Sequence, residues 1–576
     1  MKIRQKPFDN SLRRRMNIVL LFFFVLFSLL LGRIFIMQIR SHAAYSALAA
    51  RQHRLVREIH ATRGSIFMQT NHGDRVPLAL NRIQKTLIAS PRDIEDPAET
   101  AAWLAALLSL DEERLLNTLN KENDAYEIIA KKLDESLARH IEEKRVPGLF
   151  FEEEKLREYP YGSLASHLIG FVSKDEETEK GMYGLERLLD RDLAGKKGIF
   201  EGAKDAAGFW IALGRRILNP PKNGSDIVLT VDLHIQVKAE EVLRNVQAAW
   251  GAASGSVLVL EPSTGRILAL ANTPAFDPNQ YGKEKDLRVF LNTQVEGRYE
   301  PGSVIKPIVM AAALEENAVG PNTTYTDTGM AQFGSYTIRN FDGNAYGEQT
   351  MMNILEKSLN TGMIFVAQKL GKTKQLEYLK RFGFDEKTGI DLPGEIGGAI
   401  SHLGSGRDID YATAAFGQGI AVTPMQLASA IAAIANGGTL MTPYIVEKIV
   451  DDSGNERVTE PTLRRRVISP ETAETISKML VSAVRNGFEN RAGVKGYFVA
   501  GKTGTAQVSR TDGRGYSDNV IHTFVGYAPA FSPRFLILLQ LNDPKGNRFA
   551  ANTLTPAFHE LAQFILNYYE VPPDER

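Results

Sequence analysis

One stretch of the chain decides its fold, and it reads Tyr299-Glu300-Pro301-Gly302-Ser303-Val304-Ile305-Lys306-Pro307. Pro301-Gly302 predicts a turn, and the apolar, alanine-rich pattern over residues 304–314 predicts a helix directly after it. Ser303 is therefore expected at or next to the N-cap of that helix, where a small hydroxyl is favoured. Pro307 is tolerated only in or near the first helical turn, which places the helix start close to Ser303.

The same stretch predicts a serine nucleophile. Lys306 lies three residues after Ser303, so the two side chains share one face of the helix. An adjacent amine can accept the hydroxyl proton, and N–H groups at a helix start can stabilise an oxyanion. The pattern Ser-x-x-Lys occurs at no other serine of the chain. Taken alone, the pattern is equally compatible with a capped surface helix that carries a solvated lysine.

The composition is that of a folded protein with more than one domain. A chain of 576 residues predicts two or three domains, and contents of 43% hydrophobic and 24% charged residues are ordinary for globular proteins. Lys+Arg and Asp+Glu are both 68, so no overall charge favours nucleic acid as a partner. The chain has no cysteine, which excludes disulfides, and its ten histidines show no zinc-binding spacing.

The N-terminus predicts a membrane anchor. Residues 16–39 contain an apolar run long enough to span a bilayer, and they follow a basic tail, residues 1–15. Six basic residues before the span predict a cytoplasmic N-terminus: Lys2, Arg4, Lys6, Arg13, Arg14 and Arg15. The alternative is a cleaved signal peptide, for which Ala47-Leu48-Ala49 would be the processing site. That site lies far beyond the apolar run, so an uncleaved anchor is favoured.

Residues 40–222 predict a non-catalytic domain. A polar helix is expected over residues 42–60, a strand beginning at residues 63–66, and helices over residues 94–146. No set of residues in this region suggests catalysis, so we interpret it as a spacer or interaction domain. The breaker cluster Pro220-Pro221-Lys222-Asn223-Gly224 predicts a domain boundary.

Residues 223–576 predict an α+β domain in which helices flank an antiparallel sheet. Expected strands are residues 226–231, 257–260, 267–270, 497–508, 523–527 and 535–541, the second and third forming a hairpin. Expected helices, besides the one after Ser303, are residues 233–246, one opened by Thr423-Pro424 and closed near Asn436, and residues 556–568.

Two further motifs follow Ser303 in order. Ser358-Leu359-Asn360 lies in a stretch predicted to be helical, and Lys502-Thr503-Gly504-Thr505 lies in a predicted strand. Both patterns have second copies. Ser-x-Asn recurs at Ser453 and Ser517, in polar stretches predicted to be loops, and Lys-Thr-Gly recurs at Lys387, before a predicted exposed turn. Sequence context therefore favours Ser358 and Lys502.

In the order Ser-x-x-Lys, Ser-x-Asn, Lys-Thr-Gly, the chain resembles the penicillin-binding proteins and serine β-lactamases. The anchor, Arg63-Gly64, residues 157–160 and residues 184–186 resemble the membrane-bound class B penicillin-binding proteins, in which an elongated pedestal or dimerisation-type domain precedes a transpeptidase domain. Residues 300–303, Asn360 and residues 417–424 are more similar to the division type than to the elongation type. Phe67-Met68-Gln69-Thr70 departs from the Asp-Arg-Asn-Gly usual in the family, and residues 552–556 match loosely.

The resemblance implies a peptidoglycan D,D-transpeptidase that forms an acyl-enzyme on peptides ending in D-Ala-D-Ala and is inhibited by β-lactams. It assigns the nucleophile to Ser303, the base to Lys306, a proton relay to Ser358, and to Asn360 the positioning of Lys306 and of the substrate amide. The backbone N–H groups of Ser303 and Thr505 would form the oxyanion hole. The terminal carboxylate would bind in the Lys502, Thr503, Gly504 and Thr505 motif. No metal or organic cofactor is implied.

The resemblance also implies where the protein works and with what. The chain would be a single-pass protein of the bacterial cell membrane with its catalytic domain outside the cytoplasm. Its partners would be stem peptides, β-lactams, a multi-pass glycan polymerase of the shape and division type, and other division proteins. Two alternatives remain open: a D,D-carboxypeptidase or β-lactamase on the same fold, and a β-lactam sensor or division scaffold without productive turnover.

Overall fold

The computed structural model describes residues 10–42, 54–59, 61–121, 124–174, 179–203, 216–509 and 515–575. The alternative processing site at residues 47–49 and most of the basic tail lie outside the described residues. So does most of the expected helix over residues 42–60. Within that range, residues 54–59 form a strand, so the helix prediction is wrong there. These residues form a strand because they pair with residues 198–203, a distant segment that no local pattern reveals.

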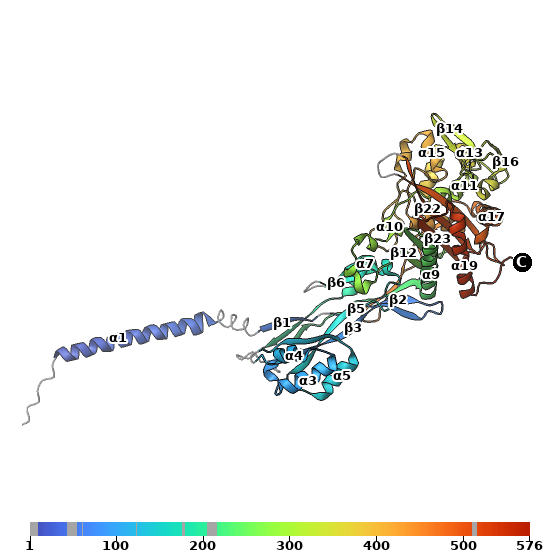
Figure 1. The fold of residues 1–576 in the computed structure, drawn as a ribbon. Coiled ribbons are helices and arrows are strands. Elements are labelled where there is room, and N and C mark those ends of the chain that lie inside the picture. Colours follow the sequence, from blue (N-terminus) through green and yellow to red (C-terminus); the bar gives the residue numbers. More distant parts are fainter. Residues whose placement is uncertain are drawn as a thin grey trace, which may run out of the picture. The chain divides into compact units, whose positions relative to one another are not determined.

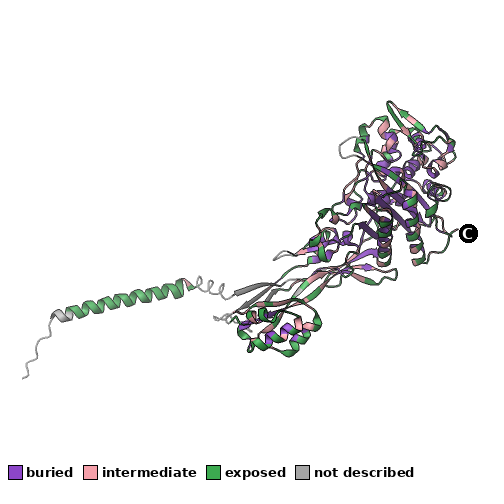
Figure 2. Ribbon diagram, in the orientation of Figure 1, coloured by how far each residue is buried: buried purple, intermediate pink, exposed green. Residues whose placement is uncertain are grey.

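The chain divides into two compact units, and the first comprises Met1–Ala61 and Gly195–Lys222. Three strands among its described residues form an antiparallel sheet in the order β1-β8-β9: β1 (Arg54–Ile59), β8 (Gly198–Ala203) and β9 (Arg216–Asn219). Its N-terminal helix α1 (Asn10–Phe35) continues into a π-helical turn, η1 (Ile36–Arg40). The side chains of residues 14–40 are exposed, and this segment is apolar and long enough to cross a membrane (Figures 1 and 2).

The second unit, Thr62–Ala194 and Asn223–Arg576, contains a mixed seven-stranded sheet. Its order is β19-β18-β10-β2-β3-β4, with β5 also pairing with β3. The strands are β2 (Ile66–Gln69), β3 (Arg75–Ala89), β4 (Glu127–Leu133), β5 (Leu149–Glu158), β10 (Asp226–Asp232), β18 (Val446–Val450) and β19 (Glu456–Val458). Strand β10 runs parallel to β2, so segments from before and after the predicted boundary at residue 222 share this sheet.

The region predicted to be helical over residues 94–146 is mixed. It contains α3 (Pro97–Leu108), α4 (Glu112–Leu119) and α5 (Glu135–Lys144), as expected from the spacing of its leucines. Strand β4 lies between α4 and α5, so the helix prediction is wrong there. The long strand β3 offers a free edge to β4, and this pairing between distant segments overrides local propensity.

A buried ionic cluster ties together three stretches that suggested the family. Arg63 donates to Glu186 Oε2 at 2.6 Å, and Arg157 Nε donates to Glu186 Oε1 at 2.7 Å. Glu186 is fully buried, and Arg63 also pairs with Asp190 at 2.7 Å. Losing one partner of such a cluster would leave an uncompensated buried charge, which costs about 3–5 kcal/mol. Glu186 and Asp190 lie in the last two of five short elements: α6 (Ser166–Ile169), β6 (Phe171–Lys174), β7 (Glu179–Met182), α7 (Gly184–Leu188) and α8 (Asp190–Ala194).

A five-stranded antiparallel sheet forms the centre of the C-terminal region, in the order β12-β11-β23-β22-β21. Its strands are β11 (Ser254–Leu260), β12 (Ile267–Thr273), β21 (Ala500–Ser509), β22 (Tyr516–Ala528) and β23 (Phe535–Asn542). Residues alternate between two cores: Ile537 and Leu539 face α9 (Leu233–Trp250) and α19 (Thr555–Tyr568). Leu536 and Leu538 face the other core, with α11 (Lys306–Glu315), α16 (Pro424–Ala435) and α17 (Pro470–Asn486). The α+β prediction is confirmed.

Most predicted elements of this region are confirmed within one or a few residues. The hairpin is β11–β12, and Thr423 caps α16 in a capping box with Gln426. Strand β22 is longer than predicted and begins at Tyr516, so the prediction of a loop at Ser517 is wrong. Ser517 is drawn into the strand by its partner β21, where its hydroxyl donates to the carbonyl of Val508 at 3.0 Å.

The remaining elements connect these layers. Helical elements are η2 (Pro91–Asp93), η4 (Pro278–Lys283), η5 (Leu287–Phe290), α10 (Thr293–Glu296), η6 (Gly302–Ile305), α12 (Met351–Glu356), α13 (Asn360–Leu370), α14 (Lys372–Arg381), η7 (Ser401–Ser405), α15 (Asp408–Ala414), η8 (Asn490–Ala492) and α18 (Ala550–Thr553). Two-stranded pairs are formed by β13 (Thr324–Asp327) with β16 (Gly347–Thr350), β14 (Met330–Phe333) with β15 (Tyr336–Arg339), and β17 (Thr439–Met441) with β20 (Leu463–Arg466).

Candidate active site

Ser303 lies in the 3₁₀ turn η6, which leads without a break into α11. It is therefore the second residue of a helical turn, close to the predicted cap position, and Pro307 lies in the first turn of α11 as expected. Gly302 has φ +60°, a conformation that favours glycine, and its N–H donates to the carbonyl of Gly417 at 3.1 Å. These constraints hold the half-buried Ser303 at the start of a rigid, buried helix.

The strand that carries the Lys-Thr-Gly-Thr motif passes close to this turn. A Cβ atom on Gly504 would lie 2.8 Å from the carbonyl oxygen of Pro301 and 3.0 Å from Cγ1 of Val304. Because those atoms belong to the turn around Ser303, only glycine lets β21 approach so closely. The third predicted motif therefore lies directly against the first.

Lys306 joins the first motif to the second. Its side chain is fully buried, and Nζ donates to the carbonyl of Ser358 at 2.6 Å, to Ser358 Oγ at 3.3 Å and to Asn360 Oδ1 at 3.0 Å. Among the described residues, the hydroxyl of Ser303 makes no hydrogen bond. The Lys306 amine is thus held one turn after Ser303 by the two polar residues of the Ser-x-Asn motif.

Ser358 occupies a tight connection between α12 and α13 rather than the helix that we predicted. Its φ is +53°, the left-handed region that a serine rarely adopts. Such a strained residue persists only where its surroundings determine it, and this one turns both its carbonyl and its hydroxyl toward Lys306.

The amide of Asn360 is oriented by its other contacts. Its Nδ2 donates to the carbonyl of Arg339 at 3.1 Å, which leaves Oδ1 as the atom that faces Lys306. The backbone N–H of Asn360 donates to Asn340 Oδ1 at 3.1 Å. The end of β15 and the residue after it therefore fix the direction of the Ser-x-Asn motif.

Lys306 is electrostatically prepared to act as a base. Burial lowers the pKa of its amine well below the ordinary value, and the nearby charge of Lys502 lowers it further. The carboxylate of Glu489 opposes both effects and raises the pKa of Lys306. Burial dominates because a charged amine loses its hydration in the interior.

Lys502 is buried in β21 and pairs with an acidic residue. Its ammonium forms an ion pair with Glu489 Oε1, and the side chains are 1% and 0% exposed. Thr503 binds the same oxygen twice, from its N–H at 3.3 Å and from its hydroxyl at 2.6 Å. Glu489 is fully buried in the loop between α17 and η8.

Thr505 lies at the exposed end of the motif. Its Oγ1 accepts a hydrogen bond from the N–H of Ala550 at 3.2 Å, at the start of α18. On the neighbouring strand, His522 is directly opposite Thr505 and binds Thr553, at the end of α18, at 2.9 Å. The two strands thus hold α18 beside the motif, with the Thr505 side chain exposed to solvent.

The second Lys-Thr-Gly copy has a different environment. Lys387 is exposed, as predicted, and lies among turns. Thr388 is buried and donates from its N–H and its hydroxyl to Glu395 Oε1, at 2.6 and 2.5 Å. Among the described residues, no lysine joins this buried contact between Thr388 and Glu395.

Comparison with known proteins identifies the two halves of the chain. The model of the penicillin binding protein transpeptidase domain matches residues 255–563, and that of the penicillin-binding protein dimerisation domain matches residues 58–229. The chain belongs to the class B penicillin-binding proteins. It is a peptidoglycan D,D-transpeptidase, and its transpeptidase domain binds β-lactams.

Curated relatives of this penicillin-binding protein match over nearly their whole length. Stage V sporulation protein D of Bacillus subtilis is 34% identical over 98% of this chain and 87% of its own. The probable peptidoglycan D,D-transpeptidase PenA of Neisseria gonorrhoeae is 31% identical over 99% of this chain and 95% of its own. Peptidoglycan D,D-transpeptidase FtsI of Escherichia coli is 29% identical, with coverages of 99% and 94%.

Solved structures agree with the fold. Penicillin-binding protein 3 of Mycobacterium tuberculosis, in complex with aztreonam, is 27% identical and matches with a TM-score of 0.70 over 90% of this chain and 98% of its own. Penicillin-binding protein 2X of Streptococcus thermophilus, 21% identical, shares the fold with a TM-score of 0.80 over 90% and 81% of the two chains.

Sequence reasoning missed Glu489, the buried partner of Lys502 in this penicillin-binding protein. Glu489 lies in a polar stretch, Phe488-Glu489-Asn490, that matches no motif. The only available signal was indirect, because a lysine placed in a buried strand needs an acidic partner. Nothing in the sequence indicated which of the 68 acidic residues would supply it.

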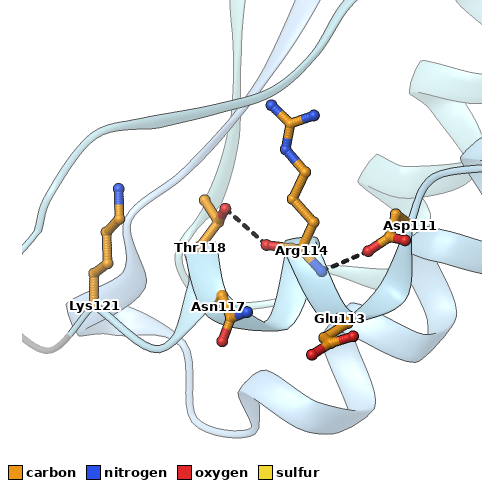
Figure 3. Close-up of a pocket in the computed structure, with 6 residues that line it drawn as sticks. All are labelled: Asp111, Glu113, Arg114, Asn117, Thr118 and Lys121. Carbon is orange, nitrogen blue, oxygen red and sulfur yellow. Dashed lines mark hydrogen bonds between the residues drawn. The ribbon is translucent and has the colours of Figure 1, made fainter.

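A hollow of about 390 Å³ lies on α4, away from the three motifs and Glu489 (Figure 3). Its lining is polar: Asp111, Glu113, Arg114, Asn117, Thr118 and Lys121. The bonds drawn there are helix contacts, from the N–H of Arg114 to Asp111 and from Thr118 to the carbonyl of Arg114. None of the predicted site residues lines it.

Proposed function

We propose that this transpeptidase works through a serine acyl-enzyme on Ser303. The observation that carries the proposal is the fully buried Lys306 amine, held one turn from Ser303 by Ser358 and Asn360. Ser303 Oγ attacks the penultimate carbonyl of a D-Ala-D-Ala peptide, and Lys306 takes the hydroxyl proton. The C–N bond to the last D-Ala then breaks, and the proton leaves with its amine through Ser358. An amine of a neighbouring stem peptide takes the acyl group and restores the serine hydroxyl.

The oxyanion formed in both steps is proposed to bind the backbone N–H groups of Ser303 and Thr505. Strand β21 is an edge strand of its sheet. The N–H of Thr503 points away from β22, because it donates to Glu489. Residues two apart in a strand point their N–H groups the same way, so the N–H of Thr505 also faces the free edge, where η6 lies. Removing one such donor typically costs about 10²- to 10³-fold in rate.

Turnover on a crosslinkable peptide tests the proposal against its alternatives. Purified protein with a stem peptide ending in D-Ala-D-Ala and an amine acceptor is expected to release D-Ala and form a crosslinked dimer. Mass spectrometry of the products decides the matter. Hydrolysis of the peptide without dimer would indicate a carboxypeptidase. Catalytic turnover of a β-lactam, without turnover of the peptide, would indicate a β-lactamase. Protein that stays acylated without releasing product would indicate a sensor or scaffold.

We further propose the cellular role of a septal enzyme. Residues 300–303, Asn360 and residues 417–424 support the division type, as does the similarity to FtsI. The proposed partners are a multi-pass glycan polymerase of the shape and division type and other division proteins. Residues 40–222 would be the pedestal and residues 223–576 the catalytic domain. A fluorescent fusion that gathers along the side wall instead of the division site would refute the septal role.

The orientation in the membrane gives a separate prediction. Basic residues precede the apolar helix, so the N-terminus is expected in the cytoplasm and residues 40–576 outside. Protease added to intact spheroplasts is expected to digest the catalytic domain, as followed by an antibody against a C-terminal tag. A cytoplasmic protein monitored in parallel controls for lysis. Full protection of the tag would contradict this orientation.

A further inference from the structure

A buried anion lies among the groups that are proposed to bind the substrate carboxylate. Glu489 Oε1 accepts from the Lys502 ammonium and from both the N–H and the hydroxyl of Thr503. Its other oxygen, Oε2, is buried and has no partner among the described residues. Glu489 belongs to none of the three motifs, yet it contacts two of the residues in the third.

The contact restricts what Thr503 can do. A hydroxyl carries one hydrogen, and the Thr503 hydroxyl already donates it to Glu489 at 2.6 Å. It cannot donate to a substrate carboxylate at the same time. Thr505 differs, because its Oγ1 accepts from Ala550 and, among the described residues, its own hydrogen has no acceptor on the exposed side of the motif. Glu489 therefore holds the Thr503 hydroxyl, which must turn away from Glu489 before it can donate to a substrate carboxylate.

The second Lys-Thr-Gly copy shows which part of the Glu489 contact is a common structural feature and which part is specific to the proposed active site. Glu395 binds the N–H and hydroxyl of Thr388 just as Glu489 binds those of Thr503. Glu395 Oε2 is also satisfied, by the N–H of Gly389 at 3.1 Å, and Lys387 is exposed. The glutamate–threonine contact is thus a local structural feature of both copies. Only at Glu489 does a buried lysine join it.

The charges that act on Lys306 come from two places. Strand β21 presents Lys502, and the loop after α17 presents Glu489. The α12–α13 connection contributes the neutral hydroxyl of Ser358, and the first residue of α13 contributes the neutral amide of Asn360. Glu489 therefore acts on the proposed base in two opposite ways. It anchors the cation that favours the neutral amine, and its own charge opposes that cation.

We propose that Glu489 is a positioning residue of this reaction, which fixes the Lys502 ammonium and the Thr503 hydroxyl and partly cancels the charge of Lys502 at the base. This inference rests on the proposed function of Ser303 and Lys306. It assigns Glu489 no contact with the substrate. Its effect passes through Lys502, Thr503 and Lys306.

The test is the pH profile of acylation by benzylpenicillin in Glu489→Gln. Glutamine has nearly the same shape but no charge. We expect the plateau rate to fall by about tenfold, because charge-assisted bonds to Lys502 and Thr503 are replaced by weaker ones. The acid limb of the profile is the range in which the rate rises with pH as Lys306 loses its proton. We expect this limb to move to lower pH, because the variant removes the Glu489 charge, which raises the pKa of Lys306. Lys502→Ala should move the limb the opposite way, to higher pH.

Two variants complete the design. Glu395→Gln removes a buried carboxylate from a matching threonine contact, and it is expected to leave the acid limb unmoved. Glu489→Asp keeps the charge, so its limb should return toward that of the wild type although its plateau stays low. An unmoved limb in Glu489→Gln, or an equal movement in Glu395→Gln, would overturn the proposal. Circular dichroism shows whether Glu489→Gln folds. If it does not fold, Glu489→Asp decides the matter. An acid limb in Glu489→Asp near that of the wild type would support the proposal, and one displaced as far as that of Lys502→Ala would overturn the proposal.

Failure of this inference can be told from failure of the proposed function. Intact-mass spectrometry and peptide mapping of the penicillin adduct are run on the wild type. An adduct at a residue other than Ser303 refutes the acyl-enzyme proposal, and with it the role of Glu489. An adduct at Ser303 together with an unmoved limb in Glu489→Gln refutes the positioning role alone.

Discussion

Replacing Ser303 with alanine is expected to abolish covalent labelling by penicillin and the crosslinking of stem peptides. Alanine fits the half-buried position in η6 and leaves the buried contacts of Lys306 in place. The fold should therefore persist while the attacking atom is absent. Loss of the nucleophile in a serine enzyme costs at least about 10⁴-fold in rate. Intact-mass spectrometry after incubation with benzylpenicillin measures the adduct directly.

A matched control is Ser453→Ala. Ser453 starts another Ser-x-Asn copy, but it is exposed in the turn between β18 and β19. This variant should acylate at the wild-type rate, with its adduct on the peptide that contains Ser303. A stable adduct that persists in Ser303→Ala would show that another residue is the nucleophile.

Replacing Lys306 with methionine is expected to slow acylation by about 10²- to 10⁴-fold, the usual contribution of a general base. Methionine has a similar length but cannot accept a proton. Only the neutral amine of Lys306 can act as the base, so the wild-type rate should rise with pH until the pKa of Lys306 is passed, and then level off. Burial and then Lys502 lower that pKa, which extends the plateau toward neutral pH. Lys306→Met should lose this acid limb.

The measurement is the second-order acylation rate with one β-lactam between about pH 5 and pH 9. Lys387→Met serves as the control, since Lys387 is exposed in the second Lys-Thr-Gly copy. It should keep both the rate and the limb. A retained limb in Lys306→Met would assign the titration to another group and remove Lys306 from the role of base.

Local patterns were sufficient where the physical cause is itself local. The cap Thr423, the proline after it and the glycines that follow Asn436 bound α16, because capping and chain reversal depend on neighbouring residues. The apolar runs of β11, β12 and β23 were predicted for a similar reason. Strands buried on both faces show continuous hydrophobicity, and both faces of this sheet are covered.

Predictions failed where a distant partner decides. Strand β4 forms because β3 offers it an edge, and Ser517 joins β22 because β21 lies beside it. Ser358 was predicted to be helical, but its positive φ is imposed by the contacts of a turn that packs against Lys306. In each case the stabilising contact joins segments that are far apart or differently folded, so a window of neighbouring residues contains no trace of it.

The sequence alone determined the family, the α+β class and the three motifs, because the order and spacing of Ser303, Ser358 and Lys502 are properties of the chain itself. Tertiary structure decided how these motifs meet. Lys306 reaches the carbonyl of Ser358, 52 residues away, only because α11 packs beside the α12–α13 connection. The partner of Lys502 was likewise decided by folding, because a buried ammonium needs a carboxylate in space and not at any fixed distance in sequence.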